Sequence, residues 1–275
     1  MKRILIIGET GEIASDLYEY LNENNIVYRT SRQRRDNGFY LDLESNDFSH
    51  VADFPKVDFV VFASGIAGND ACLKNSRKSQ LVNVKNTIQA IDYLSAITRQ
   101  IYFISTSLCF GRDLNSTDFS NLYLRQKLEV EQKILDLYPS TFLLRPSKVI
   151  GLKNKRIKDW FDKISIGEVL EVPSNVYHAP VSTLMLSQVI ERHSEQPDLR
   201  IVHLSSSELI SLSEFVELLI KISKLDGRIN RTQFGHPNIG DSMSFLETSQ
   251  RNLQELGFQQ ENIEEILRGY LLNLN

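Results

Sequence analysis

The sequence predicts an α/β protein built around a doubly wound, parallel sheet. Short apolar runs alternate with segments of helical periodicity through the first 150 residues. The apolar runs have the length of single buried strands, as parallel sheets require. The segments between them carry their apolar residues on one face only, as helices that cover a sheet do.

The expected strands are short, and a strong one, 57–63, reads Val-Asp-Phe-Val-Val-Phe-Ala. Between strands lie expected helices at 13–21, 81–94 and 123–137, whose apolar residues recur every three or four positions. We expect strands at 4–7, 26–30, 39–41, 57–63, 101–105 and 142–144, the last ended by Arg145-Pro146.

The pattern changes after residue 151. Three prolines, Pro173, Pro180 and Pro197, divide this part of the chain into short segments. Within it we expect a strand at 201–204 and helices at 213–224 and 263–272. These features predict a smaller C-terminal part that packs closely on the sheet domain.

Composition narrows the class of protein. The 275 residues are 41% hydrophobic, and the net charge of -4 gives no reason to expect a nucleic-acid or membrane partner. Cys72 and Cys109 lie in or near apolar stretches, which indicates reduced, packed thiols. The apolar run 4–7 is too short for a signal peptide or membrane span, so we expect a cytoplasmic protein. The five histidines show no metal-ligand spacing, and we expect no metal site.

A glycine-containing turn follows the first expected strand. Gly8-x-x-Gly11-x-x-Ala14 can bring backbone N–H groups against a pyrophosphate at the start of a helix. Gly8 allows the tight turn, Gly11 the close approach and Ala14 the close helix–sheet packing. Because this turn opens an alternating α/β chain, it predicts a Rossmann-type dinucleotide site that includes Gly8, Thr10, Gly11, Glu12 and Ile13.

The end of the second strand indicates which dinucleotide binds. A carboxylate there would hold the ribose 2′-hydroxyl of NAD, but the run 29–35, Arg-Thr-Ser-Arg-Gln-Arg-Arg, contains no acid. Ser31 and Arg32 are therefore candidates for the 2′-phosphate of NADP(H), with NAD(H) as the alternative cofactor. A solvated basic loop is the other interpretation of this run. Asp42-Leu43 follows the third strand, where the acid could accept a hydrogen bond from the adenine amino group.

A hydroxyl group and a tyrosine–lysine pair form the candidate catalytic set. Tyr123 and Lys127 are one helical turn apart and share a helix face. A free tyrosine, with a pKa near ~10, is a poor proton shuttle at neutral pH, and we expect the charge of Lys127 to lower that pKa. Thr106, in the Ser-Thr-Ser run 105–107, could hold the substrate oxygen that Tyr123 protonates. The Tyr-x-x-x-Lys spacing alone is also typical of an exposed helix pair, and its position after 105–107 favours catalysis.

In these motifs the chain resembles the extended short-chain dehydrogenases/reductases, of the NAD(P)-dependent epimerase/dehydratase family that acts on nucleotide sugars. The resemblance covers nearly the whole chain. Besides the glycine turn and the catalytic set, it rests on Ala63-Ser64-Gly65, Val82-Asn83-Val84, Phe110-Gly111, 145–151 and Ala179-Pro180-Val181-Ser182.

The resemblance implies a Rossmann-type sheet domain with a smaller C-terminal substrate-binding part. Residues 1–150 would form the NADP-binding domain and residues 151–275 mainly the substrate-binding part, with segments near 176–205 returning to the first domain. It also implies that Thr106 matches the family's catalytic Ser/Thr, that Lys127 bonds the nicotinamide ribose and that His178 lies in a segment lining the substrate site. Further cofactor contacts are implied for Ala63, Ser64, Gly65, Asn83, Pro146 and Lys148.

Two departures from the family pattern narrow the activity. The dehydratases of the family carry an Asp-Glu pair directly after the catalytic Thr, whereas this chain has Ser107-Leu108, so we expect no elimination of water. Asp113 and Asp118 lie later in the loop and are candidate replacements for that pair. The stretch 111–123 is also shorter than usual, which changes one wall of the sugar site.

The sequence thus predicts an NADP(H)-dependent reductase of a keto nucleotide sugar, in particular a 4-keto one, with Tyr123 as the proton donor. Two alternatives stay open: an NAD(P)-dependent nucleotide-sugar epimerase, and a non-catalytic NADP-binding regulator on the same fold. The intact set Thr106, Tyr123 and Lys127 argues against the regulator. The sequence leaves the base, the sugar and the oligomeric state open, a homodimer included.

Overall fold

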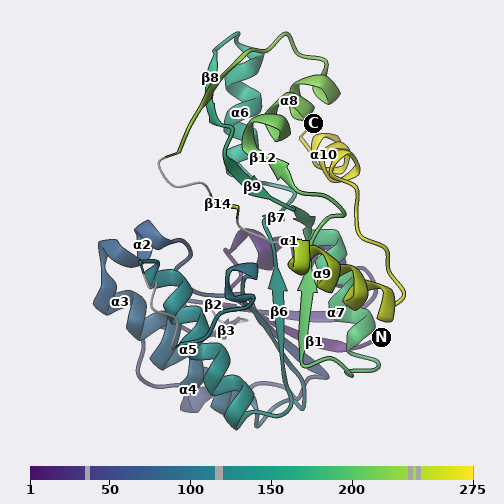
Figure 1. Ribbon diagram of the computed structural model, residues 1–275. Helices are drawn as coiled ribbons and strands as arrows, with labels where there is room; N and C mark the ends of the chain where they lie inside the picture. The colour runs from purple at the N-terminus through teal and green to yellow at the C-terminus, as the bar shows by residue number, and fades with distance from the viewer. Residues whose placement is uncertain (35–37, 115–119, 235–237, 240–242, 275) are drawn as a thin grey trace. The chain divides into compact units, whose positions relative to one another are not determined.

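The computed structural model describes residues 1–34, 38–114, 120–234, 238–239 and 243–274. Its main sheet has seven strands: β1 (Arg3–Ile7), β2 (Ile26–Ser31), β3 (Phe39–Tyr40), β4 (Phe59–Phe62), β5 (Ile101–Ile104), β6 (Thr141–Pro146) and β11 (Ile201–Leu204). They lie in the order β11-β6-β5-β4-β1-β2-β3, and β1 pairs in parallel with both β2 and β4 (Figure 1). The chain reverses its direction of growth at β1, so the predicted doubly wound class is confirmed.

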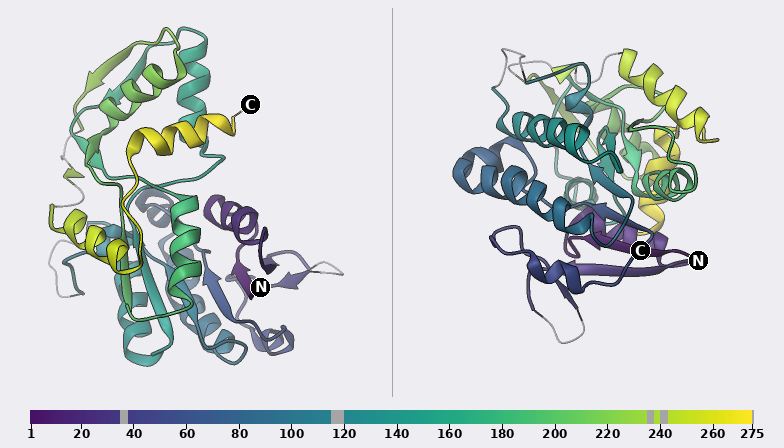
Figure 2. Two further views of the ribbon diagram at one scale, coloured as in Figure 1. Left: turned by 90° about the vertical axis from the view of Figure 1, so that its right-hand side faces the viewer. Right: turned by 90° about the horizontal axis from the view of Figure 1, so that it is seen from below.

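Helices pack against both faces of this sheet (Figures 1 and 2). On one face, Ile91 and Ile134 join a core cluster that includes Phe103 of β5. On the other face, the ring centroid of His193 lies 5.6 Å from that of Tyr102. The helical segments of this part are α1 (Glu12–Leu21), η1 (Ser49–Asp53), α2 (Asn69–Lys74), α3 (Ser76–Gln80), η2 (Leu81–Lys85), α4 (Asn86–Leu94), η3 (Ser107–Cys109) and α5 (Leu122–Leu137).

Strand β4 shows why these runs form interior strands. All four of its residues, Phe-Val-Val-Phe, are fully buried. The burial of each such side chain contributes about 1.5–3 kcal/mol, which favours a position covered on both faces over a sheet edge. The observed strand is shorter than the predicted run 57–63 because its pairing with β1 starts at Phe59 and ends at Phe62.

Two boundaries differ from the sequence prediction. The predicted helix 81–94 is divided, because Leu81–Lys85 forms a π-helical turn between α3 and α4. A π turn takes in one extra residue, and such turns frequently mark functional sites. Strand β6 continues through Pro146, and the next N–H group, that of Ser147, still bonds to the carbonyl oxygen of Leu204 at 2.8 Å.

The chain forms two compact units: residues 1–145 with 190–202, and residues 146–189 with 203–275. The second unit has a core around Ile157, Phe215 and Leu267. Its elements are β7 (Val149–Ile150), α6 (Lys155–Ser165), β8 (Leu170–Pro173), β9 (Val176–His178), β10 (Val181–Ser182), most of α7 (Thr183–His193), β12 (Ile210–Ser211), α8 (Leu212–Ser223), β13 (Ile229–Thr232), β14 (Asn238–Ile239), α9 (Met243–Glu255) and α10 (Ile263–Leu272).

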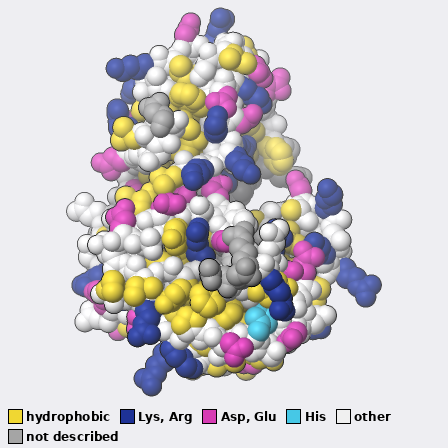
Figure 3. Space-filling view, turned by 180° about the vertical axis from the view of Figure 1, so that it is seen from behind, with side chains coloured by type: hydrophobic (Ala, Val, Ile, Leu, Met, Phe, Trp, Pro, Cys, Tyr) yellow, Lys and Arg dark blue, Asp and Glu magenta, His cyan; other side chains and the backbone are white. Residues whose placement is uncertain are grey.

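The surface carries both charges. Figure 3 shows basic and acidic side chains interspersed over the face that it presents. None of the helices in the described ranges is both long and apolar enough to cross a bilayer.

Candidate active site

The glycine turn is held in place by the end of β2. The N–H group of Gly8 donates to Oγ1 of Thr30 at 3.1 Å, and the N–H group of Glu9 donates to the Thr30 carbonyl oxygen at 3.0 Å. Gly8 has a φ of +104°, and a Cβ atom there would lie 3.3 Å from Cβ of Ser64. This position therefore requires glycine, for its conformation and for the close approach of the next loop.

Helix α1 starts beside this turn, and no side chain caps its N-terminus. The residue at its N-cap, Gly11, has an extended backbone and no side chain that could cap the helix. The positive end of the helix dipole and these N–H groups together favour a bound phosphate.

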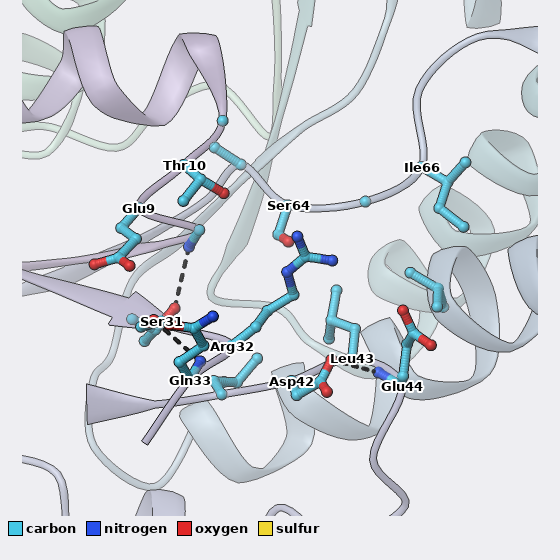
Figure 4. A pocket seen from close by; sticks show the side chains of 17 residues that line it. Glu9, Thr10, Ser31, Arg32, Gln33, Asp42, Leu43, Glu44, Ser64 and Ile66 are labelled. Carbon is cyan, nitrogen blue, oxygen red and sulfur yellow. Dashed lines mark hydrogen bonds between the residues drawn. The ribbon is translucent and has the colours of Figure 1, made fainter. Parts of the chain in front are cut away.

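A pocket of about 550 Å³ opens at the carboxyl ends of β1 to β4 (Figure 4). Ten predicted cofactor residues line it: Gly8, Thr10, Gly11, Ser31, Arg32, Asp42, Leu43, Ala63, Ser64 and Gly65. Seven further lining residues were not among the predicted cofactor residues: Glu9, Thr30, Gln33, Leu41, Glu44, Ile66 and Val82. Most of these flank a predicted residue at a strand end, and Val82 directly precedes the predicted Asn83, so adjacency to a predicted residue would have been the signal.

The arginines within and after β2 have different surroundings. Arg29 lies over the ring of Tyr18, 3.7 Å from its centroid, and Arg34 lies 4.8 Å from the ring centroid of Tyr40. Arg32 instead extends into the pocket, where it is the one cation among the described lining residues (Figure 4). Arg35 is outside the described residues.

Two of the three acids that line the pocket, Asp42 and Glu44, have local partners. Oδ1 of Asp42 accepts a hydrogen bond from the N–H group of Glu44 at 3.0 Å. Glu44 pairs with Lys78 at 2.7 Å. Since these interactions partly satisfy both carboxylates, the acids oppose an anionic ligand less than isolated carboxylates would.

The loop 63–66 rests on Asn83, which lies in the π turn. Oδ1 of Asn83 accepts from the N–H group of Ile66 at 2.7 Å, and Nδ2 donates to the Ile66 carbonyl oxygen at 2.9 Å. Asn83 is only 7% exposed. The structure thus places this predicted cofactor residue beneath the loop that lines the pocket, and Glu12 and Ile13 in the first turn of α1 outside the lining.

The candidate catalytic residues gather around the carboxyl end of β5. Nζ of Lys127 donates to the carbonyl oxygen of Ile104 at 2.8 Å and lies 5.8 Å from the ring centroid of Tyr123. Thr106 caps η3, where its Oγ1 accepts from the N–H group of Leu108 at 3.3 Å. None of the three lines the pocket of Figure 4.

Burial controls the protonation of the tyrosine–lysine pair. It raises the pKa of Tyr123, and it lowers the pKa of Lys127 to about 8 against the opposing effects of Cys109, Glu131 and Cys72. The pKa of Tyr123 is therefore raised in the protein by itself and not lowered as expected, because desolvation of the phenolate is the largest effect on it. Tyr123 holds its proton at neutral pH.

Two predicted cofactor residues belong to the second unit. Pro146 closes β6, and Lys148 precedes β7. The charge of Lys148, together with that of Arg156, adds to the effect of burial on His178, whose pKa is lowered to about 4. His178 is therefore neutral at pH 7.

The positions after Thr106 carry no acid. Ser107 is buried in η3, and Leu108 packs against a cluster that contains Cys109 and Leu124. Asp113 is exposed and Asp118 is outside the described residues. Among the described residues, no three His, Cys, Asp or Glu side chains converge as a metal site would require.

The doubly wound sheet, the glycine turn and the Tyr123–Lys127 pair define an extended short-chain dehydrogenase/reductase, a class of NAD(P)-dependent enzymes. Within it, the chain belongs to the family described as the RmlD substrate binding domain, whose model matches residues 1–271. No curated protein matches the sequence.

Solved structures share the fold at low sequence identity. A dTDP-4-dehydrorhamnose reductase from Clostridium acetobutylicum is 18% identical over 99% of both chains, with a TM-score of 0.81. One from Bacillus anthracis, in complex with NADP, is 19% identical over 98% of both chains, with a TM-score of 0.82. A UDP-N-acetylglucosamine 4-epimerase from Methanobrevibacter ruminantium is 14% identical over 99% of this chain and 98% of its own, with a TM-score of 0.78.

Proposed function

We propose that this protein reduces a keto nucleotide sugar, in particular a 4-keto one, with NADPH. The observation that carries the proposal is the Lys127 ammonium on the Ile104 carbonyl oxygen, one helical turn from Tyr123. This pair and the pocket both lie at the carboxyl ends of the strands, where ligands bind in open α/β sheets. The solved structures of similar fold include two dTDP-4-dehydrorhamnose reductases, which supports the substrate class.

The pocket residues fit NADP(H). The Gly8 turn allows a pyrophosphate close to the backbone, and the uncapped start of α1 supplies N–H groups to it. Arg32 offers a guanidinium fork to the 2′-phosphate that distinguishes NADP(H) from NAD(H). When bound, NADPH supplies the hydride that the substrate carbonyl carbon receives.

The side chains of the protein handle the proton. Tyr123 donates its phenolic proton to the carbonyl oxygen while the carbon receives hydride, so that C=O becomes CH–OH. Lys127 stabilises the phenolate that Tyr123 becomes. Thr106 accepts a hydrogen bond from the N–H group of Leu108, which leaves its own O–H group to orient the substrate oxygen.

Reduction suits these groups better than epimerisation does. An epimerase first oxidises its sugar, and this step needs Tyr123 as a phenolate base. Burial raises the pKa of Tyr123, which favours the protonated phenol from which a reduction starts. We further propose that residues 1–150 bind the cofactor, that residues 151–275 mainly bind the nucleotide sugar, and that the enzyme works in the cytoplasm.

The test is an incubation of the purified protein with NADPH and a panel of 4-keto nucleotide sugars. The absorbance of the reduced cofactor should fall with at least one of them, in equal amount to the 4-hydroxy sugar formed. An epimerase would instead interconvert 4-hydroxy sugars with bound oxidised cofactor and would consume no NADPH. That result would replace the proposed function.

A further inference from the structure

A buried chain of amide groups joins the pocket loop to the catalytic helix. Gln126 is fully buried in α5, between Tyr123 and Lys127 in sequence. Its Oε1 atom accepts a hydrogen bond from Nδ2 of Asn83 at 2.8 Å. Since Asn83 binds both backbone groups of Ile66, one side chain connects α5 with the loop 63–66 that lines the pocket.

The amide nitrogen of Gln126 is also hydrogen-bonded. Its Nε2 atom donates to Oγ of Ser79 at 2.8 Å, and Ser79 in turn donates to the carbonyl oxygen of Cys72 at 3.1 Å. A fully satisfied polar network in a buried region fixes one arrangement of the elements that it joins. Here those elements are the pocket loop, the π turn and α5.

The loop 63–66 cannot shift far unless Asn83 shifts with it. Gly65 has a φ of +150°, and a Cβ atom there would lie 3.1 Å from Oδ1 of Asn83, so the loop packs directly on this amide. A ligand that orders the loop therefore also orders Asn83. The hydrogen bond from Asn83 to Gln126 carries that ordering to the helix with the proton donor and its lysine.

We propose that Gln126 is a positioning residue that couples occupation of the dinucleotide pocket to the placement of Tyr123 and Lys127 on α5. This role rests on the proposed function, because it requires the pocket to bind a dinucleotide. Gln126 touches neither cofactor nor substrate in this account. It acts through Asn83 on one side and through the helix backbone on the other.

A probe that cannot reach the catalytic residues separates this coupling from direct contact. Adenosine 2′,5′-bisphosphate has the adenosine and 2′-phosphate of NADP but no nicotinamide. The pocket lining includes neither Tyr123 nor Lys127, so a ligand confined to it affects α5 only through the protein. The readout is amide hydrogen exchange in the segments 63–66 and 122–128, with and without this probe.

Three variants isolate the hydrogen bond from Asn83. Gln126→Met keeps the size of the side chain but accepts no such bond, and folding should survive because Asn83 still bonds to Ile66 and Ser79 to Cys72. Gln126→Glu keeps an acceptor for Nδ2 of Asn83. Gln132→Met makes the same chemical change on the exposed side of α5, where Gln132 bonds only to Asp136 among the partners described.

In the unaltered protein and in Gln126→Glu and Gln132→Met, the probe should slow exchange in both segments, by about 5-fold or more in α5. In Gln126→Met the probe should still protect the loop but no longer α5. Retained protection of α5 in Gln126→Met, or lost protection in Gln126→Glu or Gln132→Met, would overturn the coupling and leave the proposed function standing. Failure of the unaltered protein to bind the probe would overturn both.

Discussion

Nζ of Lys127 lies 5.8 Å from the ring centroid of Tyr123, and burial shifts the pKa values of both groups towards their neutral forms. The phenol therefore keeps its proton at neutral pH. The charge of Lys127 responds to pH in the working range, because burial lowers its pKa to about 8. The proposed proton donor and the proposed stabiliser of its phenolate therefore titrate in different pH ranges.

The first prediction concerns the pH dependence of this pair. The value of kcat/KM for NADPH should fall as pH rises through about 8, because the free enzyme then loses the Lys127 charge that stabilises the phenolate. Lys127→Arg keeps its charge throughout, so its activity should be lower but should show no such fall. A pH profile with the same limb in Lys127→Arg would assign the titration to another group.

The second prediction concerns cofactor preference. Arg32→Ala should weaken NADPH binding about 10- to 150-fold, as expected for the loss of a charged hydrogen bond worth roughly 1.5–3 kcal/mol, and should barely change NADH binding. The matched control is Arg29→Ala, which removes the same charge from a residue stacked on Tyr18 outside the pocket. Titration calorimetry with both cofactors measures the difference. Equal losses for NADPH and NADH would remove Arg32 from the 2′-phosphate site.

The third prediction concerns stability in acid. Neutral His178 is half-buried beside Lys148 and Arg156, and its pKa is lowered from 6.5 to about 4. The unfolded chain takes up the proton first, so stability should decrease as pH falls from about 6.5 to 4, by at most about 3 kcal/mol. In urea unfolding, His178→Gln should lose correspondingly less free energy of unfolding over this range. Identical pH profiles for both proteins would exclude His178 as a source of the loss.

The fourth prediction concerns dehydration. Removal of water from a 6-hydroxy nucleotide sugar needs an acid and a base besides the tyrosine, and neither Ser107 nor Leu108 can serve. Mass spectrometry of a nucleotide glucose incubated with the protein and oxidised cofactor should show no product lighter by one water. Such a product would point to Asp113 or Asp118 as the replacement acid.

The sequence predicted those helices, strands and turns whose pattern of apolar residues or glycines lies within one short segment. The strand 201–204 and the helix 263–272 have the bounds that periodicity gave them, and the glycine turn opens the pocket as its spacing indicated. Strands of two or three residues, such as β9 and β12, carry no period of their own. They depend on pairing between distant positions, as Ile210 pairs with His178.

The parts of the candidate site that follow strand ends were predictable from the sequence. Those that depend on buried contacts between distant segments were not. The π turn could not be predicted from periodicity, because Leu81 and Val84 continue the spacing of the apolar residues in the helix that follows. The link from Asn83 to Gln126 spans 43 positions, and no pattern in either segment indicates it. The expected low pKa of Tyr123 was wrong because the sequence spacing shows a nearby charge but does not show how strongly burial desolvates the phenolate.

We propose above all that Tyr123 donates the proton in an NADPH-dependent reduction. Tyr123→Phe removes only the phenolic hydroxyl, so folding and NADPH affinity should be retained. With NADPH and the 4-keto nucleotide sugar that the unaltered protein reduces, the decisive measurement is the single-turnover rate of NADPH consumption. We expect a loss of at least about 100-fold in Tyr123→Phe. A rate equal to that of the unaltered protein would contradict it.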